Sequence, residues 1–189
     1  MFTASEKRKT NIAEYLLYMW QIEDMIRAND LDIDKIRHKV IDRYTTLTLG
    51  QRKQLEEWYE SLIDMMISEG IRERGHMQIN QNVLSSIIDL HHVLLKDPKF
   101  GKYTEEFYRT LPYIVELRAK SGAEKSGEIE TCFNALYGML LLRISQKEIS
   151  QSTADAIKQI SSFIALLSHY YRNNDEGHLF NQPDATVGE

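Results

Sequence analysis

The sequence predicts an all-α protein, a single bundle of six or seven helices with a disordered C-terminal tail. Apolar residues recur every three or four positions along most of the chain, which is the period of an amphipathic helix. The 189 residues include only 3 prolines and 9 glycines, the residues that most often interrupt helices. No alternating segment rich in valine and isoleucine marks a strand. We therefore expect one helical domain over residues 1–172 and a flexible tail over residues 173–189, where the periodicity stops.

Four helices are expected in the first part of the chain. They cover residues 5–28, 33–44, 48–70 and 80–96. Thr48 is the expected N-cap of the third. Three acids stand around the start of the second helix: Asp30, Asp32 and Asp34. They resemble the start of a calcium-binding loop, but Lys35 and Ile41 stand where that loop needs glycine and glutamate. We interpret these acids as charges that complement the dipole of the second helix.

Three further helices are expected in the rest of the chain. They cover residues 103–119, 128–145 and 150–172. Pro112 lies inside the first of these, so we expect either a kink there or two short helices. Cys132, the only cysteine, lies in a very apolar stretch of the next helix. We interpret it as a small buried hydrophobic residue, because free cysteine is among the most buried residue types.

Composition excludes several classes of function. The net charge of −5 argues against nucleic acid as a partner, since phosphate neutralisation needs a basic face. No apolar run is long enough to cross a membrane, and the N-terminus has no apolar signal segment. These points, with the single cysteine, predict a cytoplasmic protein. Metal motifs are absent apart from one weak pair, Asp89-x-x-His92, so we expect no metal and no cofactor.

Four charged or titratable side chains fall on apolar helix faces: Glu14, His91, Arg118 and Arg143. A buried charge without a partner costs several kcal/mol, so the favoured interpretation is mutual pairing. We expect Glu14 to be largely buried and within salt-bridge reach of Arg118, Arg143 or His91. A tyrosine hydroxyl or a carbonyl would satisfy His91.

The alternative interpretation is a ligand pocket. Two guanidinium groups and an imidazole could converge on a small anion or carboxylate. In that case the protein is a binder of small anionic ligands or an enzyme, and Glu14, His91, Arg118 and Arg143 are its ligand-binding residues. The same four side chains thus carry both hypotheses, and no catalytic residue is assigned in either.

Long segments of the chain resemble one family of proteins. They are "NIAEYLLYMWQIEDMIRAN", "WYESLIDMM", "LPYIVELRAK" and "EIETCFNALYGMLLLRISQKEIS". They look like uncharacterised bacterial proteins of domain-of-unknown-function family 4924, over about residues 6–172. The resemblance implies a helical, cytoplasmic bacterial protein. It implies no activity, substrate or catalytic residue.

The function that the sequence favours is a non-enzymatic protein-interaction or structural module. The first and sixth expected helices have large apolar faces, which favours self-association. A two-fold homodimer is the commonest such assembly. We also expect a protein partner whose identity the sequence does not specify, and no partner that is a nucleic acid or a membrane.

Overall fold

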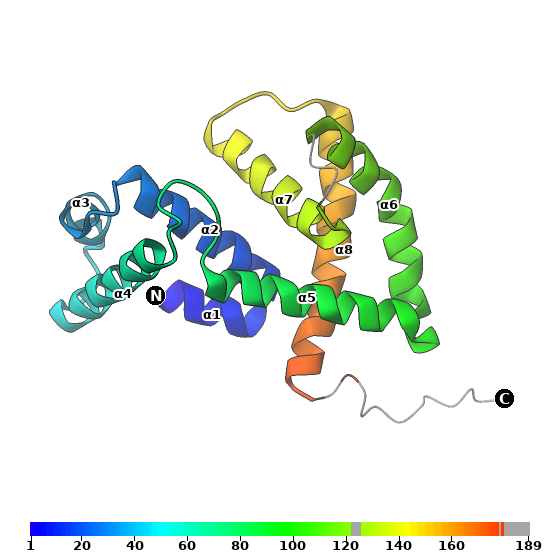
Figure 1. Ribbon diagram of the computed structural model, residues 1–189, viewed down its shortest axis with the longest axis horizontal. Coiled ribbons are helices and arrows are strands. Elements are labelled where there is room, and N and C mark those ends of the chain that lie inside the picture. The colour runs from blue at the N-terminus through cyan, green and yellow to red at the C-terminus, as the bar shows by residue number, and fades with distance from the viewer. Residues whose placement is uncertain (122–125, 178, 180–189) are drawn as a thin grey trace.

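The computed structural model describes residues 1–121, 126–177 and 179, and within them the chain is built from α-helices (Figure 1). The predicted all-α class is confirmed. The α-helices are α1 (Phe2–Thr10), α2 (Ile12–Ala28), α3 (Ile33–Lys39), α4 (Leu49–Ser68), α5 (Gln78–Lys96), α6 (Gly101–Ser121), α7 (Glu128–Ile144) and α8 (Gln151–Asp175). Two short 3-10 helices, η1 (Ile41–Arg43) and η2 (Pro98–Phe100), lie between them. The described residues thus contain one α-helix more than the six or seven predicted.

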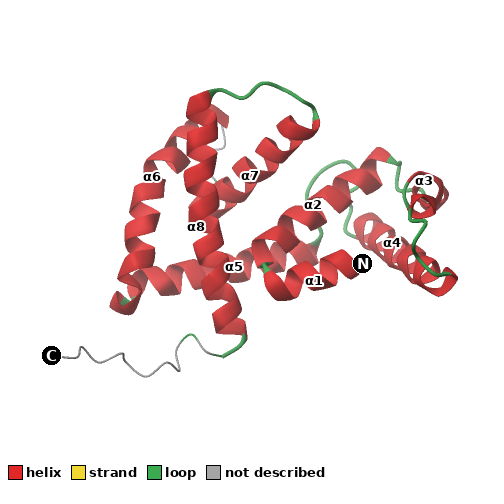
Figure 2. Cartoon of the chain, turned by 180° about the vertical axis from the view of Figure 1, so that it is seen from behind, coloured by secondary structure: helices red, strands yellow, loops and turns green. Residues whose placement is uncertain are grey.

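The helices form two groups joined by α2 and α5. Figure 1 shows α1 to α4 on one side and α6, α7 and α8 on the other, with α5 running from the first group to the second. α2 packs against α1 in its own group and against α5, α7 and α8. Figure 2, the view from behind, shows α7 between α8 and α2. α2 therefore connects the two groups of helices.

One hydrophobic core runs through both groups. Its largest fully buried side chains come from α2, α3, α4, α5, α6, α7 and α8 and from the segments between them: Tyr103, Phe133, Phe163, Leu16, Met19, Ile26, Ile36, Ile41, Met66, Met77, Ile87 and Leu94. Cys132 is also fully buried, as predicted, and burial raises the pKa of its thiol to about 12. The thiol therefore stays protonated and acts as an apolar group.

The single helix predicted over residues 5–28 is wrong, because Asn11 divides it. Asn11 has extended backbone (φ −153°, ψ 103°), and its side-chain oxygen accepts hydrogen bonds from the N–H groups of Ala13 and Glu14. This is N-cap geometry, which asparagine favours because its short side chain can replace a backbone acceptor. The division starts α2 at Ile12 and raises the helix count by one.

Replacing Asn11 with alanine should lower the free energy of unfolding by about 1 kcal/mol, because two N–H groups of α2 lose their acceptor. Asn11→Ser keeps an N-cap oxygen and should change stability by only a few tenths of a kcal/mol. Urea unfolding followed by circular dichroism measures both. Equal stability of the two variants would contradict the capping role.

The predicted N-cap Thr48 is confirmed, and the second expected helix begins at Ile33 as predicted. Asp32 is the N-cap of α3 and accepts hydrogen bonds from the N–H groups of Asp34 and Lys35. Thr48 caps α4 in a reciprocal capping box with Gln51. The acids of this region therefore stabilise a helix start, as interpreted. The helix predicted over residues 33–44 is shorter, since α3 ends at Lys39 and is followed by η1.

α6 runs through Pro112 as one helix, so the alternative of two short helices is wrong. Proline cannot donate to the carbonyl of Tyr108 one turn earlier. Both residues are exposed, so the freed carbonyl can be satisfied by water on the outer side of the helix.

The C-terminal part extends beyond the predicted helix end. α8 continues to Asp175 rather than stopping at residue 172. The predicted tail falls mostly on residues 178 and 180–189, which lie outside the described residues. None of the helices in the described ranges is both long enough and apolar enough to span a bilayer.

Candidate functional site

A buried carboxylate lies at the junction of α2 and α5. Glu23, in the second half of α2, is fully buried, and it accepts hydrogen bonds from the segment that leads into α5. His76 Nδ1 lies 2.6 Å from one carboxylate oxygen. The backbone nitrogen of Met77 and the side-chain nitrogen of Asn80 lie 2.9 and 2.7 Å from the other. These three donors offset the cost of taking the carboxylate out of water.

The start of α5 explains why a carboxylate is needed here. Its N-cap residue is Met77, whose side chain makes no capping hydrogen bond. The first N–H groups of a helix need acceptors, and serine or aspartate usually supplies one from the N-cap. Here Glu23 reaches across from α2 and accepts from the Met77 N–H. Its negative charge also lies at the positive end of the helix dipole.

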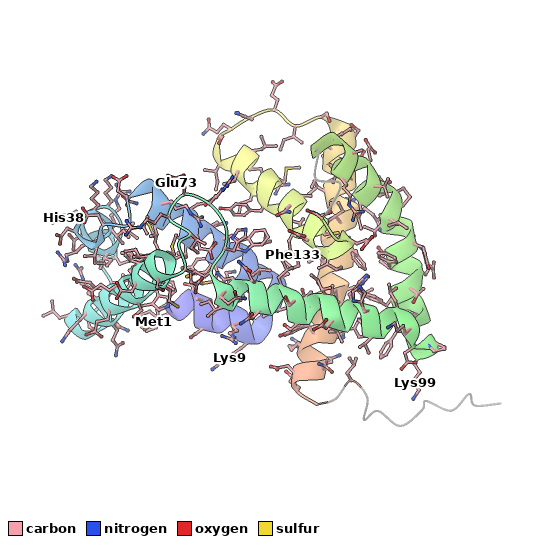
Figure 3. All side chains as sticks on the ribbon, viewed as in Figure 1. Met1, Lys9, His38, Glu73, Lys99 and Phe133 are labelled. Carbon is pink, nitrogen blue, oxygen red and sulfur yellow. The ribbon has the colours of Figure 1, made fainter. Side chains whose placement is uncertain are left out.

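Aromatic rings hold the imidazole of His76 in place. The ring of Trp20 stacks on it with centroids 4.1 Å apart and an angle of 14° between the planes. Phe133 and Tyr137 of α7 meet Trp20 edge to face, at centroid distances of 6.1 and 5.5 Å. Figure 3 labels Phe133 where α7 approaches α2 and α5. The imidazole is thus fixed both by a carboxylate and by a stacked ring.

A second set of polar contacts extends this cluster along α2. The Tyr137 hydroxyl donates to Asp24, and burial together with this hydrogen bond raises the pKa of Tyr137 well above its ordinary value. Arg27 forms an ion pair with Asp24 at 2.9 Å and donates to the carbonyl groups of Ile71 and Gly75. The network therefore fastens both α7 and the loop before α5 to α2.

The contacts of this cluster hold α7 and the segment before α5 against α2. The His76 side chain is 34% exposed, and its Nδ1 is oriented by Glu23, an arrangement that catalytic sites also use. However, its side-chain contacts are a carboxylate and an indole. Within the described ranges, no group of three histidine, cysteine, aspartate or glutamate side chains is placed to hold a metal. We assign the cluster a structural role because its hydrogen bonds join α2 to the start of α5 and to α7.

A long open groove lies between α2, α7 and α8. Its volume is about 840 Å³. Leu17, Leu136, Met139 and Leu140 supply its apolar surface from α2 and α7. From α8 it is lined by residues between Gln151 and Ala165, which is a length of about 21 Å at 1.5 Å per helical residue.

Two of the four predicted site residues, Glu14 and Arg143, line this groove. Glu14 is not buried as predicted: its side chain is 56% exposed and forms an ion pair with Lys7 of α1 at 2.5 Å. Arg143 is exposed as well, because the last turn of α7 extends beyond the core. The predicted contact of Glu14 with Arg118, Arg143 or His91 is therefore wrong, since Lys7 is its partner.

The other two residues lie elsewhere in the fold. His91 is 2% exposed with Nδ1 2.5 Å from the Tyr103 hydroxyl, so its predicted inward position and tyrosine partner are confirmed. Burial, and to a lesser degree His92, lowers the pKa of His91 to about 4. Arg118 lies 3.6 Å from Glu128 and 3.4 Å from the Thr131 hydroxyl. A ligand-binding role for the four residues stays a prediction, but only Glu14 and Arg143 share the groove.

Sequence reasoning chose the wrong carboxylate of this helix. Glu23 is the fully buried one, and the signal was its spacing. With Leu16, Met19 and Ile26 it forms a stripe of positions three or four residues apart, and all four are buried. Glu14 instead lies in the first turn of α2 on its exposed side, whereas Ile12, Ala13 and Tyr15 of the same turn are buried. His76, in an irregular loop, had no periodic signal at all.

The comparison with known protein families gives one match. The model of "Domain of unknown function (DUF4924)" matches residues 1–178. This confirms the resemblance drawn from the sequence. Neither a curated protein nor a solved structure is detectably similar to the chain. The matched region includes the groove and the Glu23 cluster.

Proposed function

The chain belongs to the DUF4924 family, and we propose that it is a non-catalytic helical module of the bacterial cytoplasm that acts through protein contacts and self-associates through the groove between α2, α7 and α8. The observation that carries the proposal is the groove itself. It is long and open, and it is partly apolar. Contiguous apolar surface of this kind is typical of interaction sites.

Exposed apolar side chains at one end of the groove also support this face as the surface of self-association. Leu141 and Ile144, in the last turn of α7, are 41% and 65% exposed. They flank Arg143 and follow Leu140, both of which line the groove. In a two-fold dimer, the end of α7 of one copy can cover the groove of the other, and the reverse contact follows by symmetry.

The charges of the groove suit pairing with a second copy. Glu14 and Asp155 are acidic, and Arg143 and Lys158 are basic. A two-fold axis brings a surface against itself, so a surface with both signs can match its own charges. A partner of strongly acidic or strongly basic character would meet like charges here. A second copy of this chain is therefore the occupant that the groove fits best.

Light scattering with size exclusion, run over a concentration series, tests the proposal. We expect the wild-type chain, of 22.1 kDa, to approach twice that mass as its concentration rises. Ile144→Glu should weaken the dimer at least about tenfold, because a carboxylate would be buried without a partner. The residue is exposed in the monomer, so the fold should be unaffected.

The matched control is Val115→Glu. Val115 is 54% exposed on α6, the helix that also carries the exposed Tyr108, and α6 does not line the groove. This variant should dimerise like the wild type. A wild type that stays monomeric at every concentration would overturn the proposal. So would a dimer that Val115→Glu dissociates and Ile144→Glu does not.

A further inference from the structure

A second, smaller pocket lies between α1, α2 and α4, away from the groove. Its volume is about 230 Å³. The apolar part of its lining consists of Met1, Ala4, Tyr15, Met19, Trp58, Leu62, Met65 and Ile79. Methionine and aromatic side chains offer a polarisable surface, and methionine adapts its shape to what it contacts. The pocket is therefore suited to an apolar group of small size.

A guanidinium group lies at this pocket. Arg8 of α1 lines it together with the exposed hydroxyl-bearing residues Ser5 and Ser61. The Arg8 guanidinium lies over the ring of Tyr15, 5.6 Å from the ring centroid, which is a cation–π distance. In the part of the chain that the structure describes, no carboxylate lies within ion-pair distance of Arg8, whereas the neighbouring Lys7 is paired with Glu14.

We propose that this pocket binds a small monocarboxylate with an apolar tail, with the carboxylate on Arg8 and the tail between Met19, Trp58 and Met65. Guanidinium is the side chain best matched to a carboxylate, because it can donate two parallel hydrogen bonds. The exposed Ser5 hydroxyl can donate to the same oxygens, whereas the Ser61 hydroxyl donates to the carbonyl of Glu57. The volume corresponds to about eight water molecules of liquid, which fits a tail of about eight carbons and not a long-chain lipid.

The walls of this pocket come from different helices. α1, α2 and α4 each line it, and α4 also packs against α3 and η1. Figure 3 shows Met1, at the start of α1, beside α4. A ligand that fills the pocket would add contacts between α1, α2 and α4. Binding should therefore raise the thermal midpoint of unfolding as well as give heat in a titration.

Isothermal titration with octanoate tests the proposal, with octylamine and octanol as probes of the head group. We expect octanoate to bind at one site per chain and to bind at least about tenfold more tightly than either of the other two. Trp58 lines the pocket, so octanoate should also change the tryptophan fluorescence. Equal affinity for octanoate and octylamine would overturn the carboxylate assignment. No binding of octanoate would overturn the site.

Substitutions at and near the pocket test whether octanoate binds there. Arg8→Gln should weaken octanoate at least about tenfold and leave octanol unchanged. Lys9→Gln is the matched control: it removes the same charge from the same helix, and Lys9 points away from α4 in Figure 3. Ser61→Trp should abolish binding of every probe by filling the pocket, and Ser61 is exposed, so the fold should tolerate it. Equal loss in Arg8→Gln and Lys9→Gln would show non-specific attraction and overturn the assignment.

Discussion

Replacing Glu23 with leucine should lower the free energy of unfolding by about 3–5 kcal/mol. The leucine side chain cannot accept a hydrogen bond, so His76, the Met77 N–H and Asn80 would all lose their common acceptor inside the protein. A buried donor without a partner costs about 1–3 kcal/mol. The expected loss is a large part of the 5–15 kcal/mol that stabilises a typical domain.

Two variants make this test specific. Glu23→Gln keeps an oxygen for the Met77 N–H and Asn80, so its cost should be clearly smaller than that of Glu23→Leu. Glu14→Leu changes the same residue type in the same helix, at a side chain that is 56% exposed. It should alter stability by less than about 0.5 kcal/mol. Urea unfolding of the three variants gives the comparison. Similar losses for Glu23→Leu and Glu14→Leu would contradict the assigned roles.

Stability should depend on pH through His91. Its pKa is lowered to about 4 in the folded protein, against an ordinary value of 6.5 in the unfolded chain, because burial disfavours the imidazolium. Between these values the unfolded chain binds a proton that the folded protein does not. The free energy of unfolding should therefore fall as the pH is lowered from 6.5 to 4, and it should rise as the pH is raised over the same range. The size of the effect is up to about 3 kcal/mol.

A double variant separates the contribution of His91 to the pH dependence from the contributions of the carboxylates and the other histidines. His91→Phe combined with Tyr103→Phe removes both members of the buried hydrogen bond, so no donor or acceptor is left without its partner. Urea unfolding at a series of pH values should show a shallower decline from pH 6.5 to 4 in the double variant than in the wild type. Identical pH dependence of the wild type and the double variant would mean that His91 binds a proton as readily in the folded protein as in the unfolded chain. That result would contradict the lowered pKa.

Two sets of polar contacts, those of Glu23 and that of Tyr137 with Asp24, position the helices that form the pocket and the groove. Glu23 holds the start of α5 against α2, and Ile79, in the first turn of α5, lines the pocket beside α4. The contact of Tyr137 with Asp24 holds α7 against α2, and α7 supplies part of the groove. Loss of Glu23 should therefore disturb the pocket more than the groove, because only the pocket includes a residue of α5.

Several features of this protein could be derived from sequence because their causes are local. Apolar periodicity predicted the helical class, and Thr48 predicted the start of α4. The phase of α5 placed His91 inward. Where a local rule was overlooked, the prediction failed in a local way: Asn11 is also an N-cap, and it divided a helix that periodicity alone had joined.

Tertiary structure alone decided which charges are buried and with what they pair. α2 is apolar on most of its surface, so the stripe that contains Glu23 was one of several apolar stripes, and only packing decided which of them faces α5 and α7. Glu23 became the buried carboxylate because α5 begins opposite it without a side-chain cap of its own. The partners of Glu23 and Arg27 come from residues about 50 positions away. No local pattern encodes such pairs, because they exist only once the helices have packed.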